Sequence, residues 1–212
     1  MNQRTLIVIL GLAVALAAGL TWQRRHNAPA FEMLYAQPGA TATELPRLWQ
    51  IPDFSLTERS GQPVTLSQLQ GRVWIADFFY TTCPGPCPML TSRFSQLQKE
   101  LSAQPDLRFV SISSDPEKDT PAVLQTYAEH FQAGDRWLFL TGDKKAIYDL
   151  ANQGFKLSLV EDKTKAVEPV IHSTKLILID RSGTVRGVYD GLTEQGKGKL
   201  LRDLHTVLGE KP

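Results

Sequence analysis

The sequence predicts an α/β domain with a mixed central sheet and an N-terminal β extension, preceded by one N-terminal transmembrane helix. From residue 51 onward, short strand patterns alternate with stretches of helical periodicity, which is typical of α/β folds. The run 73–80 (VWIADFFY) is almost continuously apolar, as expected of a central strand that is covered on both faces. The last two strand patterns form a hairpin, so the sheet is expected to contain antiparallel as well as parallel strands.

The first segment, residues 6–22 (LIVILGLAVALAAGLTW), carries no charged side chain. As a helix it would be about 26 Å long, slightly shorter than a hydrocarbon core of about 30 Å. Arg4 precedes it, and Arg24 and Arg25 follow it, which is typical of the flanks of a short membrane span. We expect an uncleaved anchor. The alternative is a cleaved signal peptide, because residues 15–17 (ALA) fit the small-residue pattern of a cleavage site.

The chain divides into three parts. Residues 1–26 are the expected anchor or signal segment, and residues 27–50, with scattered prolines and no sustained periodicity, are expected to form a flexible tether. Residues 51–212 are the expected domain. The 212 residues carry a formal net charge of +1, which argues against a phosphate-binding surface, so no nucleic-acid partner is expected. The 2 cysteines are too few for a disulfide-rich scaffold.

Strand and helix patterns follow one another through the expected domain. Two short strands flank a turn at Gly61 and form the β extension, and the buried strand 73–80 follows them. Apolar side chains at helical spacing then predict a helix, and a later helix begins at Thr120–Pro121 with a capping residue followed by proline. The predicted strands are 54–57, 64–66, 73–80, 107–112, 137–140, 176–180 and 185–189, and the predicted helices are 88–101, one from 120, 143–152 and 193–208.

The C-terminal patterns complete the sheet. Strands 176–180 and 185–189 are joined by a Ser182–Gly183 turn and therefore form the antiparallel hairpin. The last helix contains Gly196 and Gly198, which lower its helix propensity. This order of elements is compatible with a thioredoxin-like fold that carries an N-terminal extension.

Both cysteines lie in one short loop, 80–88 (YTTCPGPCP), between the buried strand and the helix after it. A helix N-terminus stabilises thiolate, the form that attacks disulfides and binds metals, and the prolines hold the two sulfurs near each other. The C-x3-C spacing is one residue wider than the redox C-x2-C motif and suits two sulfurs on one metal ion. A disulfide between Cys83 and Cys87 is also sterically allowed, but so short a loop gains little stability from a purely structural one.

A histidine would complete a copper site with these thiolates, because imidazole is a suitable third ligand for Cu(I). Of the 4 histidines, His26 lies beside the membrane segment, and His130 and His205 lie within amphipathic helices. His172 precedes the strand at 176–180, although a single histidine in that place is by itself a weak indication of function. A structural zinc site is disfavoured, because the chain offers no convincing fourth ligand.

Three motifs occur in one order: C-x3-C-P after an aromatic strand, the segment 112–121 (ISSDPEKDTP), and the pair His172–Ser173 before a late strand. In these motifs the chain resembles the Sco/SenC family, membrane-anchored copper-handling proteins of cytochrome c oxidase assembly, from about residue 51 to the C-terminus. The resemblance implies a thioredoxin-like fold and copper ligands at Cys83, Cys87 and His172. It also implies that the strand before the cysteines pairs antiparallel with the strand after the histidine, which would bring His172 to the thiolates.

The chain departs from the family pattern near the cysteines and near the histidine. Many members have an acid between the cysteines, where this chain has Gly85 and Pro86, and often an acid before the histidine, where this chain has Ile171. Fewer negative charges near the site would tune copper affinity or the choice of partner. The departures remove none of the three implied ligands.

The resemblance implies a membrane-tethered copper metallochaperone. Such a protein would receive copper, as Cu(I) or Cu(II), and deliver it to the dinuclear copper centre of a cytochrome c oxidase subunit, with other periplasmic copper carriers or thiol reductants as further partners. The implied location is a bacterial-type inner membrane, with the domain facing the periplasm. The alternative is an enzyme, a thiol–disulfide oxidoreductase of the thioredoxin superfamily for which copper is incidental. The wider cysteine spacing and the availability of His172 argue against that alternative.

Acidic residues near these motifs need an explanation. Asp77 interrupts the buried strand, where an unpaired charge is costly, and lies six positions before Cys83. Thioredoxins place a buried acid at the same offset, and by that resemblance Asp77 would relay a proton from the second cysteine. The alternative is a carboxyl group that neighbouring groups hydrogen-bond. Asp115 and Asp119 are expected to serve turns and a helix cap rather than a metal.

Overall fold

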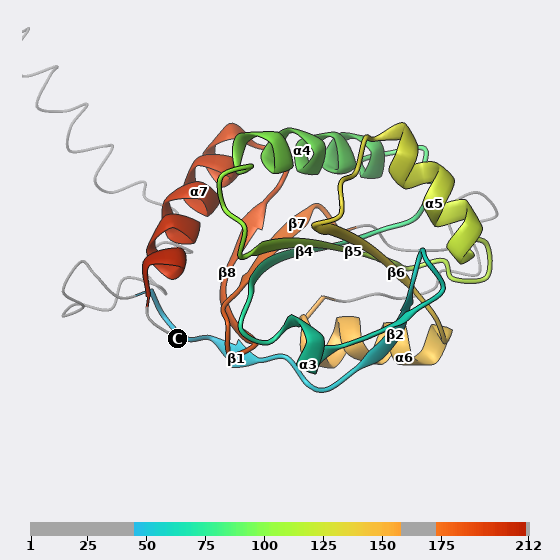
Figure 1. The fold of residues 1–212 in the computed structure, drawn as a ribbon, viewed down its shortest axis with the longest axis horizontal. Coiled ribbons are helices and arrows are strands. Elements are labelled where there is room, and N and C mark those ends of the chain that lie inside the picture. Colours follow the sequence, from blue (N-terminus) through green and yellow to red (C-terminus); the bar gives the residue numbers. More distant parts are fainter. Residues whose placement is uncertain (1–44, 158–172, 211–212) are drawn as a thin grey trace, which may run out of the picture. The chain divides into compact units, whose positions relative to one another are not determined.

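A computed structural model describes residues 45–157 and 173–210, which contain an eight-stranded mixed sheet (Figure 1). Across the sheet the strands are ordered β1–β8–β7–β4–β5–β6–β2–β3. Each strand that the sequence predicts is present, with both ends within one residue of the expected bounds. The strands are β1 (Trp49–Gln50), β2 (Ser55–Glu58), β3 (Pro63–Thr65), β4 (Val73–Phe79), β5 (Leu107–Ser113), β6 (Trp137–Thr141), β7 (Lys175–Ile179) and β8 (Thr184–Asp190).

The centre of the sheet is parallel and its flanks are antiparallel. Strands β4, β5 and β6 run parallel, with Asp77 opposite Ser111. Strand β7 runs antiparallel to β4, with Ile177 opposite Ala76, and β8 runs antiparallel to β7. The mixed sheet is therefore confirmed. So is the pairing, implied by the resemblance, between the strand before the cysteines and the strand after the histidine.

Both edges of the sheet are formed by N-terminal segments. The β2–β3 hairpin, the expected β extension, joins β6 with Thr57 opposite Thr141. Strand β1 pairs with β8 and lies within the segment 27–50 that the sequence predicts as a tether. The Trp49 side chain is anchored as well, because its Nε1 donates a hydrogen bond to the Gly154 carbonyl oxygen (2.7 Å). The described end of that segment thus belongs to the domain.

Helices cover both faces of the sheet, as Figure 1 shows. Helices α4, α5 and α7 lie on one face, and α3 and α6 lie on the other. The expected helix at 143–152 ends earlier than predicted as an α-helix and continues into a π-helical turn, η1, whose carbonyl at Leu150 accepts from the Phe155 amide (3.0 Å). The helices are α3 (Leu66–Leu69), α4 (Cys87–Glu100), α5 (Pro121–His130), α6 (Lys144–Asp149), η1 (Leu150–Gly154) and α7 (Glu194–Gly209).

Strand β4 separates two hydrophobic cores, because its side chains alternate between the two faces of the sheet. One core contains the odd-numbered apolar residues of β4 together with apolar side chains of α4, α5 and α7. The other contains the even-numbered residues of β4 with those of α3, α6 and η1. Both cysteines belong to the first core, and the alternation places Asp77 on the same face.

Helix α7 begins close to the end of β8, and glycine is required at one position there. A Cβ atom on Gly196 would lie 2.0 Å from the carbonyl oxygen of Asp190, which is far inside contact distance. A Cβ atom on Gly198 would meet only the tip of the Arg202 side chain, at 3.7 Å. The sequence predicts that both glycines weaken this helix. The structure shows that Gly196 also permits the helix to pack against β8.

Several expectations fall outside the described residues. The anchor at 6–22, most of the tether at 27–50, His26 and His172 belong to the parts of the chain that are not described. Among residues 45–157 and 173–210, no helix has the length and apolar character that crossing a membrane requires.

Candidate metal centre

The cysteine loop connects the end of β4 to the start of α4. The loop begins with a turn in which the Cys83 amide donates a long hydrogen bond to the Tyr80 carbonyl oxygen (3.3 Å). Pro86 is the N-cap of α4 with a helical backbone (φ −76°, ψ −19°), and Cys87 is its first residue. Proline fixes φ near the helical value and lacks an N–H that would be left unpaired there, which explains why the helix begins in this proline-rich segment.

Both cysteines are present as buried thiols, 5% exposed for Cys83 and 2% exposed for Cys87. Burial raises the pKa of the Cys87 thiol well above its ordinary value, and the hydrogen bond with Cys83 raises this pKa further. The position of the cysteines at a helix N-terminus predicts that thiolate is favoured. In the structure the loss of water around Cys87 is the larger effect. Cys83 is close enough to raise this pKa, so the two thiols lie near each other, as the stiff loop predicts.

Asp77 is completely buried on β4, on the same side of the sheet as the thiols. Within the described part of the chain, neither of its carboxylate oxygens has a hydrogen-bond partner. Burial raises the pKa of Asp77 to about 7, although the nearby Ser111 hydroxyl and the Asp77 amide oppose this rise. The Ser111 hydroxyl is close enough to affect this pKa but does not meet the geometry of a hydrogen bond. Asp77 is therefore a carboxyl group that can hold or release a proton near neutral pH.

Two hydroxyl groups connect α4 to α5 beside Cys87. The Thr91 hydroxyl donates to the carbonyl oxygen of Cys87 (2.9 Å), so the 3.0 Å contact between Thr91 and Tyr127 has the Tyr127 hydroxyl as donor. Burial raises the pKa of Tyr127, and the neighbouring Cys87 and Asp77 raise it further. This contact could not be predicted from the sequence, because a threonine and a tyrosine at this separation form no motif.

Asp119 lies beside the start of the cysteine loop, within the 112–121 motif. Its Oδ2 accepts hydrogen bonds from the Thr81 amide (3.1 Å) and the Ser113 hydroxyl (2.6 Å), and its Oδ1 accepts from the Thr81 hydroxyl (2.5 Å). Burial raises the pKa of Asp119, while these three donors oppose the rise. The expected helix-cap role is wrong for this residue, because the N-cap of α5 is Thr120, whose hydroxyl accepts from the Val123 amide (3.4 Å).

Asp115 does form the turn that the sequence predicts. Its carbonyl oxygen accepts from the amides of Lys118 (3.1 Å) and Asp119 (2.9 Å), and its carboxylate contacts Lys118 Nζ (3.0 Å). The Asp115 amide donates to the Ser113 hydroxyl (3.1 Å), which in turn donates to Asp119. Turn and carboxylate thus form one hydrogen-bonded unit next to the cysteine loop.

The third implied ligand, His172, lies outside the described residues. The described sheet does bring the start of β7 beside the end of β4, because the two strands are antiparallel neighbours. His130 and His205 are exposed residues of α5 and α7. Residues 45–157 and 173–210 contain no group of three or more His, Cys, Asp or Glu side chains that could hold a metal ion, so they supply two sulfurs of the candidate site.

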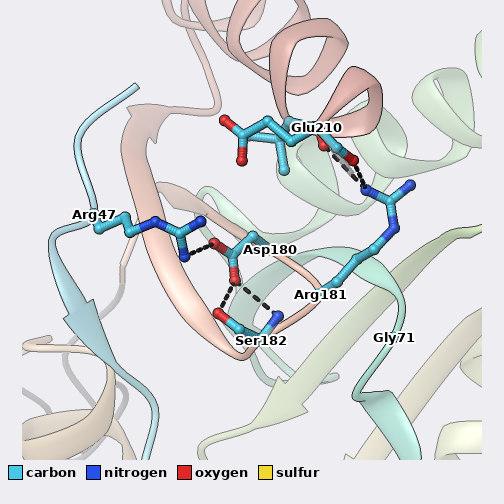
Figure 2. Close-up of a pocket in the computed structure, with 7 residues that line it drawn as sticks. Arg47, Gly71, Asp180, Arg181, Ser182 and Glu210 are labelled. Atoms are coloured by element: carbon cyan, nitrogen blue, oxygen red, sulfur yellow. Dashed lines mark hydrogen bonds and ion pairs between the residues drawn. The ribbon is translucent and has the colours of Figure 1, made fainter. Parts of the chain in front are cut away.

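A cavity of about 300 Å³ lies at the other end of β7 and is separate from the cysteine loop (Figure 2). The polar groups in its wall bind one another: Asp180 accepts from Ser182, and Arg181 donates to carbonyl oxygens at the end of α7. Behind this wall the buried Arg186, 2% exposed, binds Asp180 (3.2 Å) and both carboxylate oxygens of Glu210 (2.5 and 2.7 Å). These contacts make the region a clasp that joins β8 to Asp180 and Glu210, rather than a site with spare ligands.

The chain is similar in sequence to proteins of one family. A family model described as SCO1/SenC matches residues 44–209. The chain is 33% identical over 165 residues to the SCO1 protein homolog of Bacillus subtilis, and the match covers 76% of this chain and 84% of that protein.

Solved structures show the same similarity in three dimensions. One is BsSco, a member of the Sco family of cytochrome c oxidase assembly proteins in which a disulfide switch was identified. It has a TM-score of 0.70 and 30% identity, and the match covers 81% of this chain and 100% of that chain. Another is ScoI of Bradyrhizobium japonicum with copper bound, with a TM-score of 0.61, 26% identity, and coverage of 71% of this chain and 97% of that chain.

Proposed function

The chain belongs to the SCO1/SenC family, and we propose that it carries copper and assists the assembly of cytochrome c oxidase. The observation that carries this proposal is the pair of adjacent buried thiols at the start of α4. Relatives support the choice of metal and role: ScoI of Bradyrhizobium japonicum has been solved with copper bound, and BsSco is a cytochrome c oxidase assembly protein.

In this proposal copper is bound by Cys83, Cys87 and His172. Two thiolates and one imidazole form a soft donor set that suits Cu(I). His172 is three residues before the start of β7, a distance of at most about 11 Å along an extended chain, and that start adjoins the end of β4. Binding requires the thiols to lose their protons, so the raised pKa of Cys87 makes copper binding weaken as the pH falls.

The recipient in this proposal is the dinuclear copper centre of the oxidase, reached by exchange of ligands between the two proteins. We place the domain in the periplasm, held to the inner membrane by the apolar segment 6–22, because that segment is uncharged and flanked by arginines. The residues before Leu45 would then act as the tether. Periplasmic copper carriers and thiol reductants are the further partners that this role requires.

An anaerobic Cu(I) titration of the reduced protein tests the ligand set. We expect about one copper per chain, and a loss of affinity in Cys83→Ser, Cys87→Ser and His172→Ala. His205→Ala is the matched control, because it removes an exposed imidazole from α7. If His172→Ala leaves the affinity and spectrum unchanged, the assigned third ligand is wrong. If the two serine variants also bind copper normally, the proposed site is wrong.

A second activity, reduction of the target's cysteines before copper insertion, is favoured by Asp77. In this reaction one thiolate attacks the target disulfide, the resulting mixed disulfide is resolved by the second cysteine, and the products are a Cys83–Cys87 disulfide and a target dithiol. Asp77, buried beside the thiols with a pKa of about 7, would accept the proton of the second cysteine. We expect Asp77→Asn to slow disulfide reduction without changing copper stoichiometry. Equal rates for variant and parent protein would exclude this role.

A further inference from the structure

The two thiols are held in place in different ways. Cys87 is the first residue of α4, a helix of 14 residues that is anchored in the core by Leu90, Phe94 and Leu97. Cys83 lies in the loop, and its amide donates a hydrogen bond of 3.3 Å to the Tyr80 carbonyl oxygen, which closes the turn that presents it. A bond of that length is near the limit for N–H···O contacts and holds the turn only weakly. The position of Cys83 therefore also depends on the support that the start of this turn receives.

Asp119 provides that support. Thr81 is the second residue of this turn, and Asp119 accepts hydrogen bonds from both its amide and its hydroxyl, at 3.1 and 2.5 Å. The same carboxylate accepts from Ser113, the last residue of β5. Asp119 itself is fully buried and directly precedes the N-cap of α5, so its own position is fixed by two elements of the fold.

We propose that Asp119 is a positioning residue for the cysteine site: by fixing Thr81 it sets the place of the Cys83 sulfur relative to the Cys87 sulfur. The spacing of two thiols decides both how well they bind one metal ion together and how readily they form a disulfide. The copper part of this inference rests on the proposed function. The disulfide part does not, because it concerns the thiols alone.

Two substitutions at Asp119 separate its geometry from its charge. In Asp119→Asn the amide oxygen at the Oδ2 place still accepts from the Thr81 amide and the Ser113 hydroxyl, and the amide nitrogen donates to the Thr81 hydroxyl. All three contacts are kept. In Asp119→Ala they are all lost, and the loop is free to take other conformations. Loss of such preorganisation is expected to reduce the effective concentration of one thiol near the other by about tenfold.

The experiment measures two quantities on the full chain, purified in detergent. One is the Cu(I) affinity, by competition with a chromogenic chelator without oxygen. The other is the reduction potential of the Cys83–Cys87 pair in glutathione buffers, in which glutathione disulfide is reduced as the protein disulfide forms. For Asp119→Ala we expect about tenfold weaker copper binding and a potential about 30 mV higher, the equivalent of a tenfold change for a two-electron couple. For Asp119→Asn we expect a copper affinity and a reduction potential close to those of the parent protein.

Asp180→Ala is the matched control. Asp180 is a buried aspartate that also accepts hydrogen bonds from backbone amides and a hydroxyl, but it lies at the far end of β7 from the cysteines. This variant is expected to lower the melting temperature without moving either measured quantity. If Asp119→Ala does not fold, Thr81→Val replaces it, and a smaller shift in the same direction is expected because one of the three hydrogen bonds is lost.

The outcomes distinguish this inference from the proposed function. Unchanged affinity and potential in Asp119→Ala would overturn it, and so would equal shifts in Asp180→Ala, because general loss of stability would then explain the effect. If the parent protein binds no copper but Asp119→Ala still raises the potential and Asp119→Asn restores it, the copper function fails while the positioning role stands.

Discussion

The buried carboxyl group of Asp77 is expected to make the stability of the protein depend on pH, and the size of this effect can be measured. In the folded protein the pKa of Asp77 is raised to about 7, from 3.8 for an ordinary aspartate, because the side chain is fully buried. Between these two pH values the folded state holds a proton that the unfolded state has released. Stability must therefore fall as the pH rises from about 4 to about 7.

The size of this loss follows from the two pKa values. One pKa unit corresponds to about 1.4 kcal/mol, so the full effect above pH 7 is about 4 kcal/mol as an upper value. About 2 to 3 kcal/mol of it falls between pH 5 and pH 8. Asparagine has a similar shape and no proton to lose, so Asp77→Asn removes this part of the pH dependence. The variant is expected to be more stable than the parent protein at pH 8 and nearly equal to it at pH 4.

Urea unfolding of the reduced protein at several pH values from 4 to 8 measures the effect. The upper limit of pH 8 keeps the cysteines of the unfolded chain mostly protonated, which avoids a second contribution from thiols. Asp53→Asn is the control, because it makes the same chemical change at an exposed aspartate and removes no buried carboxyl group. Parallel stability curves for Asp77→Asn and the parent protein would refute the reasoning. They would mean that Asp77 stays ionised in the folded state, with water or other groups solvating it.

Three further predictions concern other parts of the chain. Gly196→Ala is expected to lower the free energy of unfolding by about 1 to 3 kcal/mol, because its Cβ would meet the backbone of β8. Gly198→Ala is expected to raise it by up to about 1 kcal/mol, because alanine has the higher helix propensity, and thermal unfolding measures both changes. Glu210→Gln is expected to lower the free energy of unfolding by about 2 to 3 kcal/mol, because the buried Arg186 loses a charged partner. Asp106→Asn, which breaks the exposed ion pair with Arg72, is expected to lower it by less than 1 kcal/mol, and equal losses for the two variants would contradict the role of the clasp in stability. Cu(I) affinity is expected to fall by up to about 100-fold for each pH unit below neutrality, because two thiols must lose their protons when copper binds. Competition with a chelator measures this affinity, and an affinity that does not change with pH would exclude copper binding by both thiols.

Most of the fold could be predicted from the sequence, because local patterns carry the information. Alternating and continuous apolar runs identified seven of the eight described strands to within one residue, and the Thr120–Pro121 signal identified the start of α5. Strand β1 and the short helix α3 were not predicted. The pairing of β4 with β7 could be expected only from the resemblance to a family, because the two strands are distant in the sequence. The π-helical turn after α6 was not predicted, since its backbone geometry has no simple residue pattern.

The candidate site was predicted less completely. The adjacent thiols follow from the stiff proline loop, but the direction of the Cys87 pKa shift depends on burial, which the sequence does not specify. Asp119 was expected to act on its own neighbours in the chain. Instead it binds Thr81, 38 residues away, and only the packing of β4 beside β5 brings these two residues together. Contacts of this kind follow from the assembled sheet and not from a motif.

The Arg186 clasp has a consequence for how the domain can be handled. Arg186 binds the carbonyl oxygen of Leu45 (2.7 Å) and the carboxylate of Glu210, so both ends of the described domain meet at one place. The cysteine loop is at the opposite end of β4, about 20 Å away along seven strand residues. A short linker from Glu210 to Leu45 would therefore allow circular permutation, with new termini opened in a surface turn. Attachment to a bead or a sensor surface through either end would likewise keep the support on the side of the domain that is remote from the thiols.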